Sequence, residues 1–237
     1  MSDVTLKLDW CSHEAAKYAV EKWHYSHTMP AGKIVKIGAW ENNVFIGAVL
    51  FSRGANNNIG SPYKLGQIEV CELTRIALHK HASPVSRIVS IAIKMLKKQS
   101  PELRLIVSYA DPAQDHHGGI YQAMNWLYKG PSESRKGAHF IINGKYMHGR
   151  TMRSKYGHES KIPFQWEYAT AHKHTYLYPL DDAMRAQIVP LAKPYPKRSD
   201  PLRLSSNSKM PVDQTGDNGA TPIQTLSTSA DTHEISF

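Results

Sequence analysis

The chain has 237 residues, which suffices for one well-packed domain with appendages. Its two cysteines, Cys11 and Cys71, do not have the number or spacing of a disulfide framework or a zinc–thiolate site, which favours a reducing cytoplasm. No apolar run approaches the roughly 20 residues needed to cross a bilayer, and the first ten residues lack the hydrophobic core of a signal peptide. The sequence therefore predicts a soluble cytoplasmic protein.

The net charge of +9 is unevenly distributed along the chain. Residues 131–198 hold 12 Lys or Arg and 5 Asp or Glu, whereas residues 199–237 hold 2 and 5. Lys and Arg bind polyanions because they release counterions, so the basic part favours nucleic acid as a partner. A basic surface that only keeps the protein in solution is the other interpretation. The polar tail 199–237 has no hydrophobic period and is predicted to be disordered.

Hydrophobic periodicity predicts alternating strands and helices up to residue 142. This order is typical of a mixed α/β sheet with helices on both faces, in which sites lie beyond the strand ends. The predicted strands are 4–8, 33–40, 44–51, 68–78, 103–109, 128–129 and 139–142, and the predicted helices run from 13 to about 24, from 84 to about 96 and from 116 to 126.

The segment 79–87 leads from the long strand into a helix. Backbone N–H groups at a helix start bind anions, and Ser86 and Arg87 add a hydroxyl and a cation. With Ser83 as the cap residue, this segment suits a pyrophosphate or a DNA phosphate, although it has no glycine-rich cradle. A simple capped helix is the other interpretation.

Asp111 follows a strand that is predicted to be buried. A carboxylate at such a position can act as a general base or a metal ligand, although Asp111 can also form a turn with Pro112. The adjacent His116 and His117 lack helical ligand spacing, so a metal role for both is not predicted.

Two further groups of polar residues lie on predicted elements. His24 and Tyr25 follow the first helix and provide hydrogen-bonding groups, or they stabilise the helix end. On the long strand, regular alternation places Glu72 on the face opposite to Arg75. An arginine inside a strand needs an anionic partner, which favours a role for Arg75 in lining a site.

The segment 149–157 interleaves cations with hydroxyls and an aromatic ring. Arg150, Arg153 and Lys155 suit a surface that follows phosphates while the ring stacks on bases. A solvated loop is the other interpretation.

Taken together, these motifs resemble the Mom DNA-modification proteins of phage Mu and related prophages. The resemblance covers about residues 10–160 and rests on long, unusual strings. They are WHYS at 23–26, RGANNNIG at 53–60, EVCELTR at 69–75, SPVSRI at 83–88, SYADP at 108–112 and HHGGIYQ at 116–122.

The resemblance implies a divergent GCN5-related acetyltransferase fold. It also implies transfer of a carbamoylmethyl-type group to the exocyclic amino group of adenine in double-stranded DNA, which protects phage DNA from host restriction. Residues 83–87 then occupy the place of the acyl-CoA pyrophosphate loop, without its glycines. The donor is open between acetyl-CoA and a glycine-derived group, and an iron ion is a candidate cofactor.

Within that hypothesis each selected residue has a role. The target base leaves the duplex and stacks on Tyr25, Tyr109 or Tyr121. Asp111 accepts the amino proton or, with His24 and Tyr25, holds a metal, and Arg75 stabilises developing negative charge. The residues assigned to donor binding are Ser83, Ser86 and Arg87, and Ser86 is also a catalytic candidate. The residues assigned to DNA binding are His117, Tyr121, Arg150, Arg153 and Lys155.

The sequence also predicts how the chain is divided. Residues 1–160 form the catalytic domain, 161–198 a basic extension on or near the core, and 199–237 the tail. A homodimer is compatible with this division. Two alternatives stay open: an ordinary acyltransferase acting on a protein or small-molecule amine, and a DNA-binding protein without catalytic activity.

Overall fold

The computed structural model describes residues 4–54, 58–132, 138–169 and 172–197. The predicted disordered tail, 199–237, lies outside the described residues. No helix of the described segments is long and apolar enough to span a membrane.

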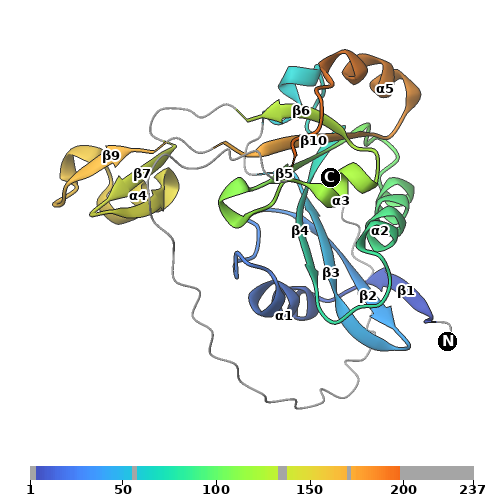
Figure 1. Cartoon of the computed structure of the whole chain (residues 1–237). Helices are drawn as coiled ribbons and strands as arrows, with labels where there is room; N and C mark the ends of the chain where they lie inside the picture. The colour runs from blue at the N-terminus through green and yellow to red at the C-terminus, as the bar shows by residue number, and fades with distance from the viewer. Residues whose placement is uncertain (1–3, 55–57, 133–137, 170–171, 198–237) are drawn as a thin grey trace.

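The main body is a seven-stranded sheet in the order β1-β2-β3-β4-β5-β10-β6 (Figure 1). Only β4 and β5 pair in parallel, and the other neighbours are antiparallel. The strands are β1 Leu6–Trp10, β2 Ile34–Glu41, β3 Val44–Ser52, β4 Val70–Leu78, β5 Leu105–Ala110, β6 Leu127–Pro131 and β10 His174–Pro179.

Helices cover both faces of this sheet. Helices α1 (His13–Trp23) and α5 (Asp182–Ile188) pack on one face, whereas α2 (Val85–Gln99) and α3 (Gly119–Ala123) pack on the other. Each helix turns its buried residues towards the sheet, as expected for amphipathic helices. The predicted fold class, a mixed α/β sheet with helices on both faces, is confirmed.

The parallel strands β4 and β5 pair over a short stretch and then part. Their register runs only from Val70↔Leu105 to Glu72↔Val107. Beyond that point the Ser108 hydroxyl donates to the Leu73 carbonyl oxygen at 2.8 Å. The sheet therefore opens between β4 and β5 towards the end of β5 that carries Asp111.

A β-bulge in β4 changes which side chains share a face. Leu50 of β3 pairs with Arg75 and Phe51 pairs with Leu73, so Thr74 is the extra residue. The bulge places Arg75 opposite Leu50 and Glu72 opposite Ser52, on the α1 face. The predicted alternation, with Glu72 and Arg75 on opposite faces, is therefore wrong.

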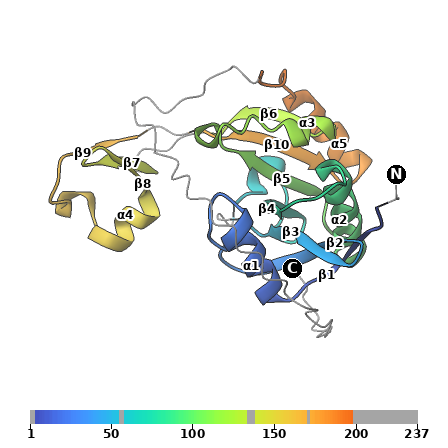
Figure 2. The same ribbon diagram turned by 60° about the horizontal axis from the view of Figure 1, so that its bottom comes forward.

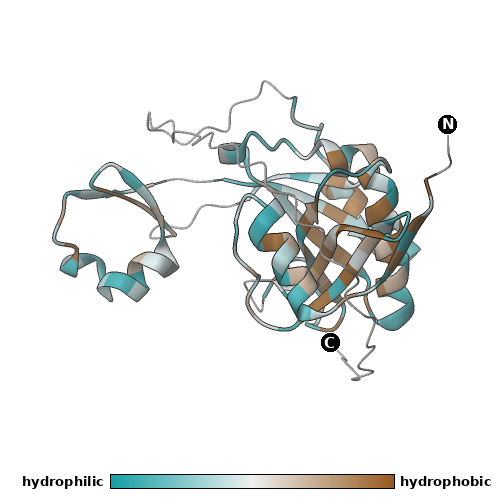
Figure 3. Cartoon of the chain, turned by 90° about the horizontal axis from the view of Figure 1, so that it is seen from below, coloured by the Kyte–Doolittle hydropathy of each residue, from teal (hydrophilic) through white to brown (hydrophobic). Residues whose placement is uncertain are grey.

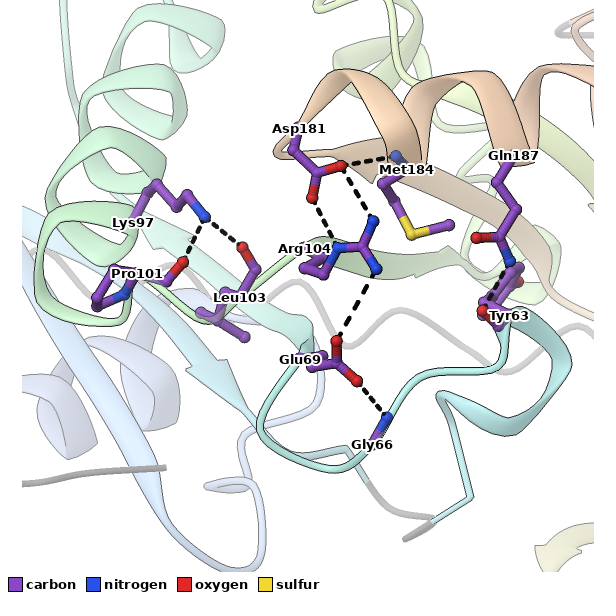
Figure 4. A network of polar contacts seen from close by, with 10 residues as sticks. All are labelled: Tyr63, Gly66, Glu69, Lys97, Pro101, Leu103, Arg104, Asp181, Met184 and Gln187. Atoms are coloured by element: carbon purple, nitrogen blue, oxygen red, sulfur yellow. Dashed lines mark hydrogen bonds and ion pairs between the residues drawn. The ribbon is translucent and has the colours of Figure 1, made fainter.

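An ion-pair network fixes the start of β5 (Figure 4). The Arg104 guanidinium donates to the Asp181 carboxylate at 2.9 and 3.2 Å, and the same carboxylate caps α5 by accepting from the Met184 backbone N–H at 2.7 Å. Arg104 also lies 3.9 Å from Glu69, which accepts from the Gly66 N–H before β4. These contacts tie together three segments that are distant in sequence.

A small lobe, defined as residues 138–169, stands beside the large sheet (Figures 1 and 2). Its three-stranded sheet has the order β8-β7-β9, with α4 packed on one face around the core residues Phe140, Ile142, Met152 and Ile162. The lobe consists of β7 His139–Ile142, β8 Lys145–His148, α4 Gly149–Tyr156, the 3-10 turn Glu159–Lys161 and β9 Trp166–Tyr168.

Several predicted elements differ from the structure. The helix predicted at 116–126 is reduced to α3, because Gly118 before it has a left-handed backbone with φ of 81°. Helix α2 begins at Val85 with Pro84 at the N-cap, so Ser83 does not cap it. Segment 149–157 forms helix α4 in place of a loop.

The predicted division at residue 160 stays a prediction. The small sheet takes strands from both sides of that residue, since β7 and β8 precede it and β9 follows it. Strand β10 lies inside the large sheet, between β5 and β6.

Candidate functional site

A charged cluster lies on the α1 face of the sheet, where β4 and β5 part. It contains Tyr25 from the loop after α1, Glu72 and Arg75 from β4, and Asp111 from the end of β5. Burial is the main cause that raises the pKa of the Tyr25 phenol, and the negative charges of Asp111 and Glu72 raise it further. The positive charge of Arg75 acts in the opposite direction. Tyr25 is therefore protonated at neutral pH and can donate a hydrogen bond, and its ring is 45% exposed.

The Arg75 guanidinium is held by neutral acceptors. Its Nε and Nη2 donate to the Thr28 carbonyl oxygen at 3.2 Å, and its Nη1 donates to the Thr74 carbonyl oxygen at 2.7 Å. Burial lowers the pKa of Arg75, whereas Tyr25 and Glu72 raise it. The carbonyl groups fix the orientation of the guanidinium, but because they are neutral they do not neutralise its charge.

His24 is buried beneath Tyr25, with ring centroids 4.3 Å apart. Its Nδ1 accepts from the Ser26 backbone N–H at 3.1 Å and lies 2.8 Å from the Ser26 hydroxyl oxygen. Burial, together with the nearby Arg75 and His116, lowers the pKa of His24 to about 4. Because a backbone N–H can only donate, the neutral ring carries its proton on Nε2.

Asp111 lies directly after β5 and forms an ion pair with Lys173, which precedes β10, with 3.5 Å between Nζ and Oδ2. The His116 ring meets the Tyr25 ring edge-on, with centroids 5.2 Å apart. The loop after β5 therefore closes against the loop after α1. The structure brings together four predicted catalytic residues: His24, Tyr25, Arg75 and Asp111.

The fifth catalytic candidate, Ser86, lies elsewhere, on the first turn of α2 with Arg87. Helix α2 packs on the face of the sheet opposite the face that carries α1 and the charged cluster. The surroundings of α2 therefore bear on the predicted donor-binding role of Ser86 and Arg87.

The start of α2 is occupied by a carboxylate of this chain. Glu41, at the end of β2, accepts from the Ala82 N–H at 2.8 Å and from the Ser83 N–H at 2.6 Å. Burial raises the pKa of Glu41, but the hydrogen bonds from Ala82 and Ser83 outweigh this effect and leave the pKa below its usual range. Glu41 is therefore an anion at neutral pH.

These contacts leave no donor at Ala82 or Ser83 for the pyrophosphate of an acyl-CoA. The N–H groups of both residues are bonded to Glu41, and the Arg87 N–H donates to the Pro84 carbonyl oxygen at 2.9 Å. A second anion beside Glu41 would also be repelled. The predicted role of Ser83 as a donor-phosphate ligand is therefore not supported.

The candidate iron ligands His24, Tyr25 and Asp111 make other contacts within the chain. The Nδ1 lone pair of His24 is used by Ser26, and its Nε2 carries the proton. Tyr25 is a protonated phenol, and Asp111 is paired with Lys173. Among the described residues, no three His, Cys, Asp or Glu side chains are grouped so as to hold a metal ion.

Tyr121, one of the predicted DNA-binding residues, is buried. Tyr121 is only 8% exposed, packs against Trp126 and Tyr176 with centroids 5.0 Å apart, and makes a hydrogen bond of 2.7 Å with the Ser108 hydroxyl. The prediction that Tyr121 contacts DNA or stacks on a base is therefore wrong. Its ring supports the strand end from which Asp111 follows.

The other predicted DNA-binding residues lie in two places. His117 is half-buried, and its carbonyl oxygen accepts from the Tyr176 hydroxyl at 2.6 Å, which anchors the loop after β5. Arg153 and Lys155 are exposed on α4, whose surface is largely hydrophilic (Figure 3). The side chain of Arg150, on the same helix, lies outside the described residues.

Sequence reasoning did not select Lys173 or Glu41. Both act through contacts with residues about 40 to 60 positions away, Glu41 with Ser83 and Lys173 with Asp111. No local pattern marks such a pair.

Comparison with known proteins assigns the family. The model of the Mom protein family matches residues 5–197, and the chain therefore belongs to this family. A curated relative, "Methylcarbamoylase mom" of Escherichia phage Mu, is 25% identical over 153 residues. This alignment covers 63% of the present chain and 62% of the phage Mu protein, which is less than two thirds of its length.

Two solved structures are among those similar to this chain. One is the N-acyl amino acid synthase FeeM from uncultured soil microbes, with a TM-score of 0.43, 11% identity and coverage of 78% of this chain and 94% of that one. Another is a Bacillus subtilis acetyltransferase in complex with CoA, with a TM-score of 0.41, 10% identity and coverage of 76% and 100%.

Proposed function

We propose that this protein is an enzyme that transfers a carbamoylmethyl-type group to the exocyclic amino group of adenine in double-stranded DNA. In the cytoplasm of an infected or lysogenic bacterium, such a modification would protect phage DNA from host restriction. The observation that carries the proposal is the cluster of Tyr25, Arg75 and Asp111 around the opening between β4 and β5, in a chain of the Mom family.

The basic charge supports DNA as the substrate. Residues 131–198 are strongly basic, and Arg153 and Lys155 are exposed on α4. These two residues, with Arg150 and His117, are assigned to phosphate contacts that position the duplex. The amino group of adenine is paired inside the duplex, so the base must leave the stack before it can react.

Asp111 is assigned the role of general base. The exocyclic nitrogen is a weak nucleophile because its lone pair is delocalised into the ring, and it becomes reactive as it loses a proton. As the new bond between nitrogen and the transferred carbon forms, the bond from that carbon to its carrier breaks. The amino proton passes to Asp111, and the electron pair leaves with the carrier. Lys173, whose Nζ lies 3.5 Å from Asp111 Oδ2, holds the carboxylate in position before this step.

Arg75 and Tyr25 are assigned to the charge that develops on the donor. The guanidinium is oriented by the Thr28 and Thr74 carbonyl groups before any substrate binds, so no reorganisation is needed. The Tyr25 phenol donates a hydrogen bond, and its exposed side chain is one of the predicted stacking surfaces and interacts electrostatically with Asp111. His24 positions Tyr25 from beneath.

The donor is proposed to be an activated carrier of a small glycine- or acetyl-derived group. A diphosphate of its carrier finds no free N–H at Ala82 or Ser83, because Glu41 accepts from both. This contact counts against a CoA-dependent acyltransferase that binds its cofactor through these two residues.

The test is mass spectrometry of nucleosides from plasmid DNA of cells that express the protein. The wild type is expected to yield a heavier deoxyadenosine, whereas Asp111→Asn lowers its amount at least about 100-fold, the lower range for loss of a general base. The control is Asp9→Asn, which removes an exposed carboxylate that pairs with Lys7. Unmodified DNA from cells with soluble wild-type protein, or full modification by Asp111→Asn, would contradict the proposal.

A further inference from the structure

Among the residues that the structure describes, helix α4 packs on one face of the small sheet and no helix packs on the other. Alternation along β7 and β8 sends Phe140, Ile142 and Met147 towards α4 and the lobe core. The opposite side is the free face, defined by five residues of the three strands: His139, Ile141, Tyr146, His148 and Glu167.

The free face carries an aromatic surface. The Tyr146 ring stacks on the His139 ring, with centroids 5.5 Å apart and an angle of 22° between the planes, and His148 meets His139 edge-on at 5.0 Å. Tyr146 is 44% exposed, so one side of this stack is open. The lobe core needs none of these rings, because it is formed by residues on the α4 side.

The free face is electrostatically coupled to the proposed catalytic carboxylate. Burial raises the pKa of Tyr146 to about 12, and the charge of Asp111 contributes to the rise. Burial lowers the pKa of His139, which is also influenced by His148, Lys173 and Asp111. Asp111 thus acts on both stacked residues of the free face, His139 and Tyr146.

Two described residues that flank the small lobe in sequence, Ser132 and Lys173, are bonded to each other. At the neck, the Ser132 N–H donates to the Lys173 carbonyl oxygen at 2.7 Å, and the Lys173 N–H donates to the Ser132 hydroxyl at 3.0 Å. The Lys173 ammonium pairs with Asp111. The same residue therefore links the neck of the small lobe to the end of β5.

Charge identifies the kind of partner. Residues 139–168 contain five Lys or Arg, all outside the free face, against two Glu. Glu159 accepts from the Tyr168 hydroxyl at 2.8 Å, and Glu167 lies on the free face. A basic lobe that carries an open aromatic stack suits a polyanion with flat rings, which is a nucleic acid.

Building on the proposed function, we propose that the free face is a stacking platform for a DNA base. Tyr146, backed by His139, receives the adenine or its neighbour once the base has left the duplex, and presents it beside Asp111. The small lobe is then the second wall of the active site, opposite the sheet. Tyr146 contacts the substrate, and His139 is a positioning residue that orients its ring.

The experiment compares three variants of the full chain, with DNA binding as a readout that needs no donor. Fluorescence anisotropy measures affinity for two labelled duplexes, one fully paired and one with a single unpaired adenine. The wild type should prefer the unpaired adenine, because extrusion of that base requires less free energy. Tyr146→Ala should reduce this preference about ten-fold, as loss of one base–aromatic stack does, with the salt dependence unchanged.

Two controls accompany it. Tyr146→Phe keeps the ring and should keep the preference, and Phe164→Ala removes another exposed aromatic ring of the same lobe, 50% exposed, and should behave as the wild type. An equal preference in Tyr146→Ala and Phe164→Ala would overturn the platform. If Tyr146→Ala loses the preference while wild-type cells contain no modified adenine, the platform stands and the proposed function fails.

Discussion

Two places near the opening of the sheet carry hydrogen-bond donors suited to an anion, and they differ in what holds those donors. The Arg75 guanidinium, on the α1 face, is held by the neutral carbonyl groups of Thr28 and Thr74. The N–H groups of Ala82 and Ser83, before α2, are held by the Glu41 carboxylate. Neutral acceptors orient a charge without cancelling it, whereas a carboxylate does both. The charge of Arg75 therefore acts on Tyr25, Glu72 and a substrate, whereas the N–H donors at Ala82 and Ser83 are already paired with a carboxylate.

The largest effect expected from this comparison follows from removing Arg75. Arg75→Met should lower adenine modification about 100-fold, because a preorganised cation beside the reacting atoms is lost, while DNA affinity falls only a few-fold. Nucleoside mass spectrometry and DNA-binding anisotropy measure the two quantities. Arg75→Lys, which keeps the charge but loses the planar fork, should lie between. Modification at the wild-type level in Arg75→Met would remove Arg75 from the mechanism.

An intermediate effect is expected at Glu41. Glu41→Gln leaves one of the two N–H groups poorly paired and should lower the free energy of unfolding by about 1–3 kcal/mol, measured by urea denaturation at pH 7. The same substitution removes the anion before α2, so coenzyme A should bind the variant more tightly than the wild type in isothermal titration.

The contribution of Glu41 to the stability of the fold depends on pH. The folded pKa of Glu41 lies below its unfolded value, so its contribution to stability is present above the unfolded pKa and is lost as pH falls through the folded pKa. The stability difference between wild type and Glu41→Gln should therefore shrink on acidification. If the wild type binds coenzyme A and inorganic pyrophosphate competes with that binding, Glu41 does not block a diphosphate at the start of α2.

The smallest effect is expected at His24. Its pKa is about 4 in the folded protein against 6.5 for a free histidine, so the unfolded chain binds more protons between these values. Protonation of His24 therefore destabilises the fold as pH falls from about 6.5 to 4. His24→Asn, which keeps an acceptor for the Ser26 N–H, should reduce this loss by roughly 2–6 °C in Tm. Thermal melts at pH 4, 5, 6 and 7 measure it, and parallel curves for both proteins would contradict the assignment.

Local patterns in the sequence determined most of the elements before residue 130. Helix α1 was predicted from the spacing of Ala16, Ala19 and Val20, and β5 from its unbroken apolar run, because both depend on side chains close together in the chain. The positions of His24, Tyr25 and Asp111 directly after these elements were predicted for the same reason. The late strands β8, β9 and β10 were missed, since their short and partly polar sequences gain stability only from pairing.

Tertiary structure alone decided which of these residues act together. The bulge at Thr74 placed Arg75 and Glu72 on one face of the sheet. This bulge is a feature of how β4 pairs with β3, so the sequence of β4 alone did not indicate it. Glu41 reached Ser83, and Lys173 reached Asp111, across segments that no local pattern connects. Tyr121, similar to Tyr25 as a sequence feature, became part of the core because packing on Trp126 and Tyr176 buries it. Local periodicity encodes the elements, whereas the charge and exposure of each side chain depend on neighbours that only folding brings near.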